Sequence, residues 1–85
     1  MVKTIVELNN PDGLHVRPGN EFVSLAKTYI STVTVENQHG EKADGKSLVE
    51  LLSLHLDEHS SILMSIDGPD EYKASSELVK ILKEA

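Results

Sequence analysis

The sequence predicts an α+β fold in which helices cover one face of an antiparallel β-sheet. Segments with alternating apolar and polar residues are interleaved with segments whose apolar residues recur at helical spacing, in the order β-α-β-β-α-β-α. The strands have single apolar faces and the helices single apolar stripes, so two layers can bury both. The 85 residues suffice for one such core. We therefore expect a two-layer open-faced sandwich, with a four-stranded antiparallel sheet and three helices on one face, in a single domain of residues 1–85.

Alternation of apolar and polar residues indicates the four strands. In residues 2–8, one side of the expected strand carries Val2, Val6 and Leu8. The sequence Gln38-His39-Gly40 is typical of a tight turn, so the second and third strands should form a hairpin. The other three strands are expected at residues 31–37, 41–44 and 60–67, with inward side chains Val33, Val35, Ile62, Met64 and Ile66.

Apolar residues at helical spacing indicate the first and third helices. The first helix begins near residue 16, and the third covers residues 71–83. The turn at residues 68–70 precedes the third helix, and Asp70 is expected to cap it. The inward residues are Gly19, Phe22, Val23, Ala26 and Ile30 in the first helix, and Ala74, Leu78, Ile81 and Leu82 in the third.

The second helix is expected to start at Ser47. Ser47 and Glu50 fit a capping box, in which the serine oxygen accepts from a backbone N–H and the glutamate reaches back to the serine N–H. Residues 48–56 are too apolar on all sides for an ordinary surface helix. Part of that apolar surface should therefore be exposed.

Composition excludes several classes of protein. The chain has no cysteine, so no disulfide or thiolate chemistry is expected. Its net charge of −6 argues against nucleic acid and against anionic membrane surfaces as partners. No apolar run approaches the ~20 residues of a membrane span, and no signal peptide opens the chain. We expect a soluble, cytoplasmic monomer that binds no metal and no cofactor.

The hexapeptide at residues 13–18, GLHVRP, carries the strongest chemical signal. Turn-forming residues precede it, and Pro18 is tolerated in the first turn of a helix. His15 is therefore expected at or just before a helix N-terminus, where backbone N–H groups have no internal partner and can bind an anion. Arg17 adds a positive charge, and a neutral imidazole is a competent nucleophile near pH 7. The hypothesis is that His15 carries a phosphoryl group; the alternative is a surface histidine at a helix end.

Two other patterns point to different chemistry. Residues 40–47 match G-x-x-x-x-G-K-S, the phosphate-binding loop of nucleotide hydrolases. That motif needs a larger, parallel sheet, and its acidic residues Glu41 and Asp44 would oppose a triphosphate, so no nucleotide site is expected. His55 and His59 have the i, i+4 spacing of metal ligands but lack a third ligand, so we interpret them as solvated.

The hexapeptide resembles the histidine-containing phosphocarrier family (HPr) of the bacterial phosphoenolpyruvate-dependent sugar phosphotransferase system. The resemblance returns at Lys46-Ser47-Leu48, at the alternating segment 62–66 and at residues 68–71, and so covers essentially the whole chain. It implies the strand order 1-4-2-3. It also implies a cytoplasmic phosphoprotein that is a carrier in sugar transport rather than an independent enzyme.

The resemblance implies a cycle and a set of site residues. Nδ1 of His15 accepts a phosphoryl group from phospho-enzyme I and passes it to a sugar-specific enzyme IIA. Arg17 stabilises the charge of the phosphate, and the backbone N–H groups of Val16 and Arg17 cradle it. Partners dock on residues that match exposed apolar or positive positions of the family, namely Leu48, Val49, Leu52, Lys27 and Lys46.

Ser47 matches a regulatory phosphorylation site of the family. The resemblance implies an HPr kinase/phosphorylase, and a catabolite-control transcription factor as a further partner. A rival function follows, that of a regulatory binding module that acts through the Ser47 face on a transcription factor or metabolic enzyme. Retention of both His15 and Arg17 favours the carrier, because a pure binding module needs neither residue. Glu50 departs from the family, whose members often have glycine or lysine there.

Overall fold

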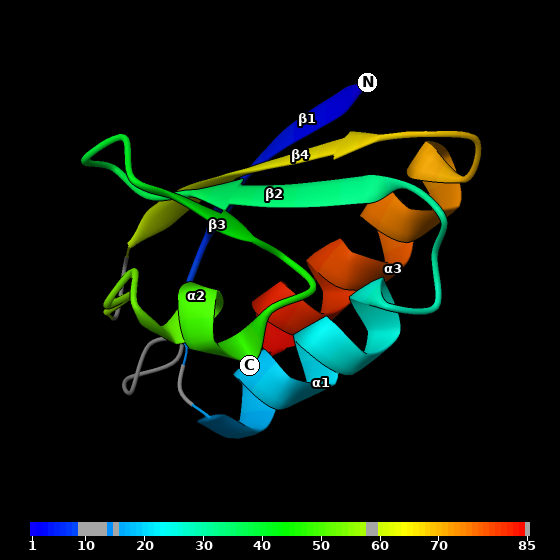
Figure 1. Cartoon of the computed structure of the whole chain (residues 1–85). Helices are drawn as coiled ribbons and strands as arrows, with labels where there is room; N and C mark the ends of the chain where they lie inside the picture. Colours follow the sequence, from blue (N-terminus) through cyan, green and yellow to red (C-terminus); the bar gives the residue numbers. More distant parts are fainter. Residues whose placement is uncertain (9–13, 15, 58–59, 85) are drawn as a thin grey trace.

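The structure is a computed structural model that describes residues 1–8, 14, 16–57 and 60–84. Within these residues, strands and helices follow the predicted order, and the helices lie together on one face of the sheet (Figure 1). The predicted α+β two-layer architecture is therefore confirmed. The elements are β1 (Val2–Glu7), α1 (Val16–Ala26), β2 (Thr32–Glu36), β3 (Lys42–Asp44), α2 (Leu48–Leu52), β4 (Ser61–Asp67) and α3 (Glu71–Glu84).

The sheet has the order β1-β4-β2-β3, as the family resemblance implied. All three strand pairs are antiparallel. β4 lies between β1 and β2, with Met64 opposite Thr4 on one side and Val35 on the other. β4 is therefore a central strand, paired with β1 along one edge and with β2 along the other.

The core lies between the sheet and the helical layer. Ile62, Met64 and Ile66 of β4 are buried, as are the inward valines of β2. Phe22 from α1 and Leu78 from α3 are fully buried against them. The opposite face of the sheet has no helical cover in Figure 1, and Ile5 of β1 is 75% exposed there. The period-2 pattern therefore predicted the buried face of the sheet correctly.

The prediction that Ile30 belongs to the inward face of the first helix is wrong. α1 ends at Ala26, and Ile30 is 80% exposed in the connection to β2. The backbone N–H of Ile30 donates to Oδ2 of Asp70 at 2.9 Å, and that of Ser31 donates to Oδ1 at 3.0 Å. The Ser31 hydroxyl also donates to Asp70. The connection is therefore held by a tertiary contact that helical spacing does not reveal.

Asp70 has a second role that the sequence did not predict. Its carbonyl oxygen accepts from the Ala74 N–H at 2.9 Å at the start of α3. Its carboxylate accepts from the α1–β2 connection, some forty positions away along the chain, and so joins two loops. The turn at residues 68–70 does precede α3, and the helix begins at Glu71 as predicted. Ala74, Leu78 and Leu82 are buried, whereas Ile81 is half-buried.

The second helix is shorter than its apolar run. α2 ends at Leu52, and the buried residues Leu54 and Leu56 lie beyond it in irregular chain. Only half of the predicted capping box forms: Ser47 Oγ accepts from the Glu50 N–H at 3.3 Å. The Glu50 carboxylate accepts from the backbone N–H of Asp44 at 3.2 Å, not from Ser47.

Protonation of Asp70 is expected to destabilise the fold. Hydrogen bonds from the Ser31 hydroxyl and from the backbone of the α1–β2 connection lower the pKa of Asp70 below its usual value. A carboxylate with a lowered folded-state pKa stabilises the fold above its unfolded-state pKa, and this contribution is lost as pH falls through the lower, folded-state value.

Urea unfolding at several pH values would measure this effect. At pH values below about 3.9, the unfolded-state pKa of an aspartate, the free energy of unfolding should decrease as the pH falls. Asp70→Asn should make this decrease smaller. Asp57→Asn, at an exposed position, is the matched control. Parallel curves for Asp70→Asn and the unchanged protein below this pH would contradict the prediction.

Within the described part of the chain, no helix is long and apolar enough to cross a membrane.

Candidate functional site

The predicted phosphoacceptor His15 lies outside the described residues, as does His59. The residues on either side of His15 are described. Leu14 is buried, and its N–H donates to the carbonyl oxygen of Leu56 at 3.0 Å. Val16 is the first residue of α1. The residue before His15 is therefore buried and hydrogen-bonded, and the residue after it begins a helix.

The N-terminus of α1 has the properties of an anion site. The first backbone N–H groups of α1 have no partner within the helix. Pro18, in the first turn, has no backbone N–H group. The first turn carries no acidic residue. Arg17 and Val16 are both exposed, so the guanidinium and the neighbouring amides can approach an anion from solvent.

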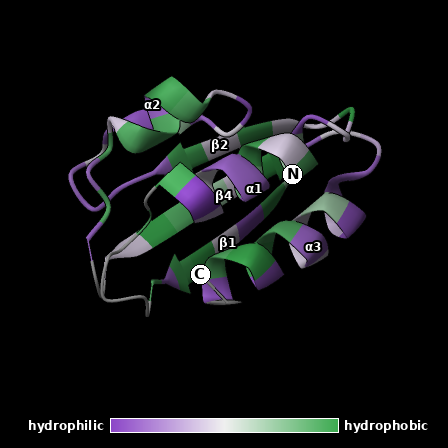
Figure 2. Ribbon diagram, turned by 90° about the horizontal axis from the view of Figure 1, so that it is seen from below, coloured by the Kyte–Doolittle hydropathy of each residue, from purple (hydrophilic) through white to green (hydrophobic). Residues whose placement is uncertain are grey.

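Apolar side chains reach the surface at the start of α1 and on α2. We call Val16 of α1 and Leu48, Val49 and Leu52 of α2 the apolar surface. Val49 is 80% exposed, whereas Leu48 and Leu52 are half-buried. α2 packs against α1 at Gly19, where an added Cβ would lie 3.3 Å from Leu48 Cδ1. The ribbon of α2 is mostly hydrophobic in Figure 2, whereas α3 alternates between hydrophobic and hydrophilic residues. Of the predicted apolar docking residues, Leu48 and Leu52 thus lie beside Gly19 near the start of α1.

The two predicted positive docking residues differ in their surroundings. Lys27 is exposed immediately after α1, and its N–H donates to the carbonyl oxygen of Val23 at 3.0 Å. Lys46 is half-buried, and its Nζ donates to the carbonyl oxygen of Tyr29 at 2.8 Å. Ser47 follows it as the N-cap of α2 and is half-buried. Sequence reasoning missed the contact of Lys46, because nothing local links residues 29 and 46.

The competing motifs do not have the structural context that their chemistry needs. Residues 42–44 inside the G-x-x-x-x-G-K-S match form β3 of an antiparallel sheet, whereas a phosphate-binding loop follows a strand of a parallel one. His55 is exposed beyond the end of α2, so helical spacing does not apply to it. Among the described residues, no group of three or more potential metal ligands comes together.

Gly19→Ala is expected to stabilise the fold by roughly 0.5–1 kcal/mol. Glycine inside a helix costs about 1 kcal/mol relative to alanine. The added Cβ would approach only the ends of two flexible side chains, Leu48 Cδ1 at 3.3 Å and Leu52 Cδ2 at 3.6 Å. Both leucines are half-buried and can shift toward solvent. Urea unfolding would measure the change; a lower free energy of unfolding would show that close contact between α1 and α2 requires glycine.

Comparison with known proteins identifies the family. The sequence model described as "PTS HPr component phosphorylation site" matches residues 2–84. The chain belongs to the HPr family. It is 40% identical over 83 residues to the phosphocarrier protein HPr of Borreliella burgdorferi, covering 98% of this chain and 95% of the relative.

Solved HPr structures share the fold. The structure of HPr from Thermoanaerobacter tengcongensis is 32% identical, with a TM-score of 0.91 and coverage of 96% of this chain and 91% of that one. HPr from Bacillus anthracis is 26% identical, with a TM-score of 0.90 and 96% coverage of both chains. The resemblance inferred from the sequence is therefore confirmed. The chain is a phosphocarrier of the phosphotransferase system (PTS), not an independent enzyme, and its partners are components of that system.

Proposed function

We propose that His15 is the phosphoacceptor of this HPr and that it receives its phosphoryl group from phospho-enzyme I. The N-terminus of α1 is the observation that carries the proposal. The helix begins at the residue after His15, Arg17 in its first turn is exposed, and that turn contains no acidic residue. Unpaired backbone N–H groups and a guanidinium favour the anion that a phosphohistidine would present.

The transfer needs positioning and charge stabilisation. The lone pair on Nδ1 of a neutral His15 attacks phosphorus in line, the new P–N bond forms, and the bond from phosphorus to the histidine of enzyme I breaks. The Arg17 guanidinium and the N–H groups of Val16 and Arg17 stabilise the phosphoryl oxygens. Val16 and Arg17 are exposed at the helix end, so a sugar-specific enzyme IIA can reach the phosphohistidine and accept its phosphoryl group.

Both partners dock on one surface in this proposal. The apolar surface of Val16, Leu48, Val49 and Leu52 adjoins the start of α1, so a partner covering it excludes water from the reacting groups. Lys27 and Lys46 contribute positive charge toward acidic partners. A phosphoryl group on Ser47, at the N-cap of α2, would add negative charge at the edge of this surface and weaken such docking. The carrier acts as a monomer in the cytoplasm.

Intact-mass measurement would test the proposal. The protein is incubated with enzyme I and phosphoenolpyruvate, and one added phosphate is expected that disappears in acid, as a P–N bond requires. Addition of an enzyme IIA should remove it at neutral pH. An unmodified mass with an active enzyme I would refute the carrier function and favour the regulatory module. An acid-stable phosphate would refute a histidine acceptor.

A further inference from the structure

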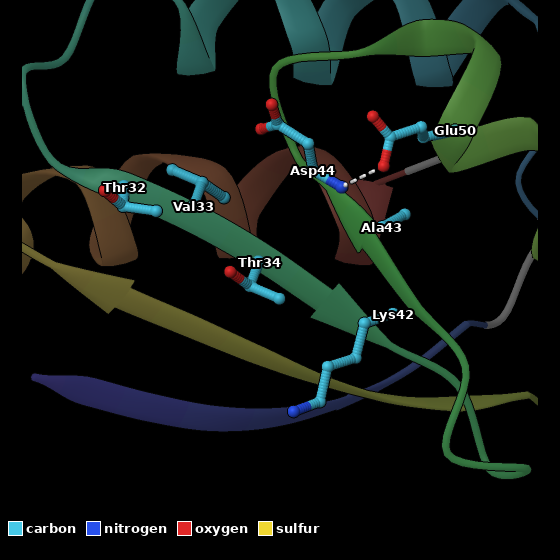
Figure 3. A pocket seen from close by; sticks show the side chains of 7 residues that line it. All are labelled: Thr32, Val33, Thr34, Lys42, Ala43, Asp44 and Glu50. Atoms are coloured by element: carbon cyan, nitrogen blue, oxygen red, sulfur yellow. Dashed lines mark hydrogen bonds between the residues drawn. The ribbon is translucent and has the colours of Figure 1, made fainter.

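Asp44, Ser47 and Glu50 form a closed set of hydrogen bonds between β3 and α2. The Ser47 N–H donates to the carbonyl oxygen of Asp44 at 3.0 Å, and the Glu50 N–H donates to Ser47 Oγ at 3.3 Å. The Asp44 N–H donates to Oε1 of Glu50 at 3.2 Å, which closes the set (Figure 3). The side chain of Glu50 is thereby held toward the end of β3.

This position of Glu50 separates its charge from the apolar surface. In Figure 3 its carboxylate points to Asp44, at the end of a shallow groove that β2 and β3 line with Thr32, Thr34 and Lys42. Its neighbour Val49 is 80% exposed and belongs to the apolar surface. Because Glu50 is itself exposed, its long side chain can leave Asp44 and turn into solvent without breaking the core.

Negative charge on Ser47 would meet like charge in this arrangement. Ser47 Oγ already contacts the backbone of Glu50, and the Asp44 carboxylate is held nearby because its Oδ1 accepts from the Lys46 N–H at 2.9 Å. The ammonium group of Lys46 is engaged by the carbonyl oxygen of Tyr29. α2 has only five residues, so its dipole offers little compensation.

We infer that Glu50 is a charge-responsive latch: negative charge on Ser47 releases its carboxylate from the Asp44 N–H and turns it into solvent beside Val49. The modified Ser47 then adds one negative charge beside the apolar surface, and the released Glu50 carboxylate adds a second. The latch therefore amplifies the effect of modifying Ser47. The physiological use of the latch rests on the proposed regulation of Ser47, but its mechanism depends only on charge at that position.

Hydrogen exchange of the Asp44 backbone amide, measured by NMR, tests the latch without any partner protein. Ser47→Asp is compared with Ser47→Asn, because both residues can cap a helix and have nearly the same shape, whereas only aspartate is charged. We expect the Asp44 amide to exchange roughly two- to fivefold faster with aspartate than with asparagine, as expected for repulsion between exposed charges. In the Glu50→Gln background the two variants should exchange at the same rate.

Glu21→Gln is the matched control, because it removes the same charge from an exposed position on α1. In that background the difference between aspartate and asparagine at position 47 should persist. Equal exchange of the Asp44 amide in the two Ser47 variants would overturn the latch, and so would a difference that survives Glu50→Gln. Neither readout involves phosphoryl transfer, so failure of the latch is distinguishable from failure of the proposed carrier cycle.

The functional consequence is measured with enzyme I. Ser47→Asp should raise the KM for phosphorylation by enzyme I relative to Ser47→Asn, and Glu50→Gln should remove part of that increase. Glu21→Gln should leave the increase unchanged. An increase of equal size in the Glu50→Gln background would show that the charge on residue 47 acts directly, and would overturn the amplification.

Discussion

Replacing His15 with alanine is expected to abolish phosphate uptake from phosphoenolpyruvate and enzyme I. The proposed cycle has one covalent acceptor, and removing the nucleophile of such a step leaves no alternative route for the phosphoryl group. The helix terminus and Arg17 would remain, but in the proposed cycle they stabilise charge and accept no phosphoryl group. The measurement is intact mass, or acid-labile radioactivity, after incubation with catalytic amounts of enzyme I.

His39→Ala is the matched control for the loss of an imidazole. His39 is exposed in the turn between β2 and β3, where its backbone N–H donates to Oδ1 of Asn37. Phosphate uptake should be normal in this variant, and both variants should have the far-UV circular dichroism of the unchanged protein. Retained labelling of His15→Ala, or loss of labelling in His39→Ala, would contradict the assignment.

Gly68→Ala is expected to lower the free energy of unfolding by roughly 3 kcal/mol or more, the largest loss among the glycine substitutions considered. Gly68 has φ of +155°, which L side chains rarely adopt. An added Cβ would lie 2.4 Å from Ser31 Oγ and 2.6 Å from Ser31 Cα. Ser31 is buried and donates to Asp70, so relieving the clash would separate the two loops that Asp70 joins.

Gly40→Ala separates backbone strain from packing. Gly40 has φ of +82°, but nothing lies within 4 Å of an added Cβ. This variant should lose only the cost of a left-handed residue, about 1–2 kcal/mol. Urea unfolding of both variants gives the comparison. A loss for Gly68→Ala no larger than that for Gly40→Ala would contradict the argument from packing against Ser31.

Local pattern predicted most of the fold because each element buries one face. Alternation of Ile62, Met64 and Ile66 identified the buried side of β4, and helical spacing identified Ala74 and Leu78 in α3. The strand order needed the family resemblance, since an apolar face says which side is buried but not which strand lies beside it. Similarly, the residue types around His15 led to the hypothesis of a phosphoryl carrier, and the family resemblance was needed to favour it over a surface histidine at a helix end.

The errors arose where distant residues decide local structure. Ile30 continues the helical spacing of α1, but Asp70 holds that segment in another conformation. Glu50 fits a capping box, but the Asp44 N–H is a competing donor that sequence spacing does not show. Leu54 and Leu56 extend the apolar run of α2, but they are buried outside the helix.

For this HPr, the sequence by itself determined the alternation of strands and helices, the buried faces and the chemistry expected at His15. These properties follow from backbone periodicity and side-chain chemistry, which act within a few residues. Only the tertiary structure decided that Asp70 joins two loops, that Lys46 contacts Tyr29, and that Glu50 turns toward β3. Those contacts depend on which donors and acceptors folding brings together, and hydrogen bonds form over about 3 Å of space regardless of separation along the chain.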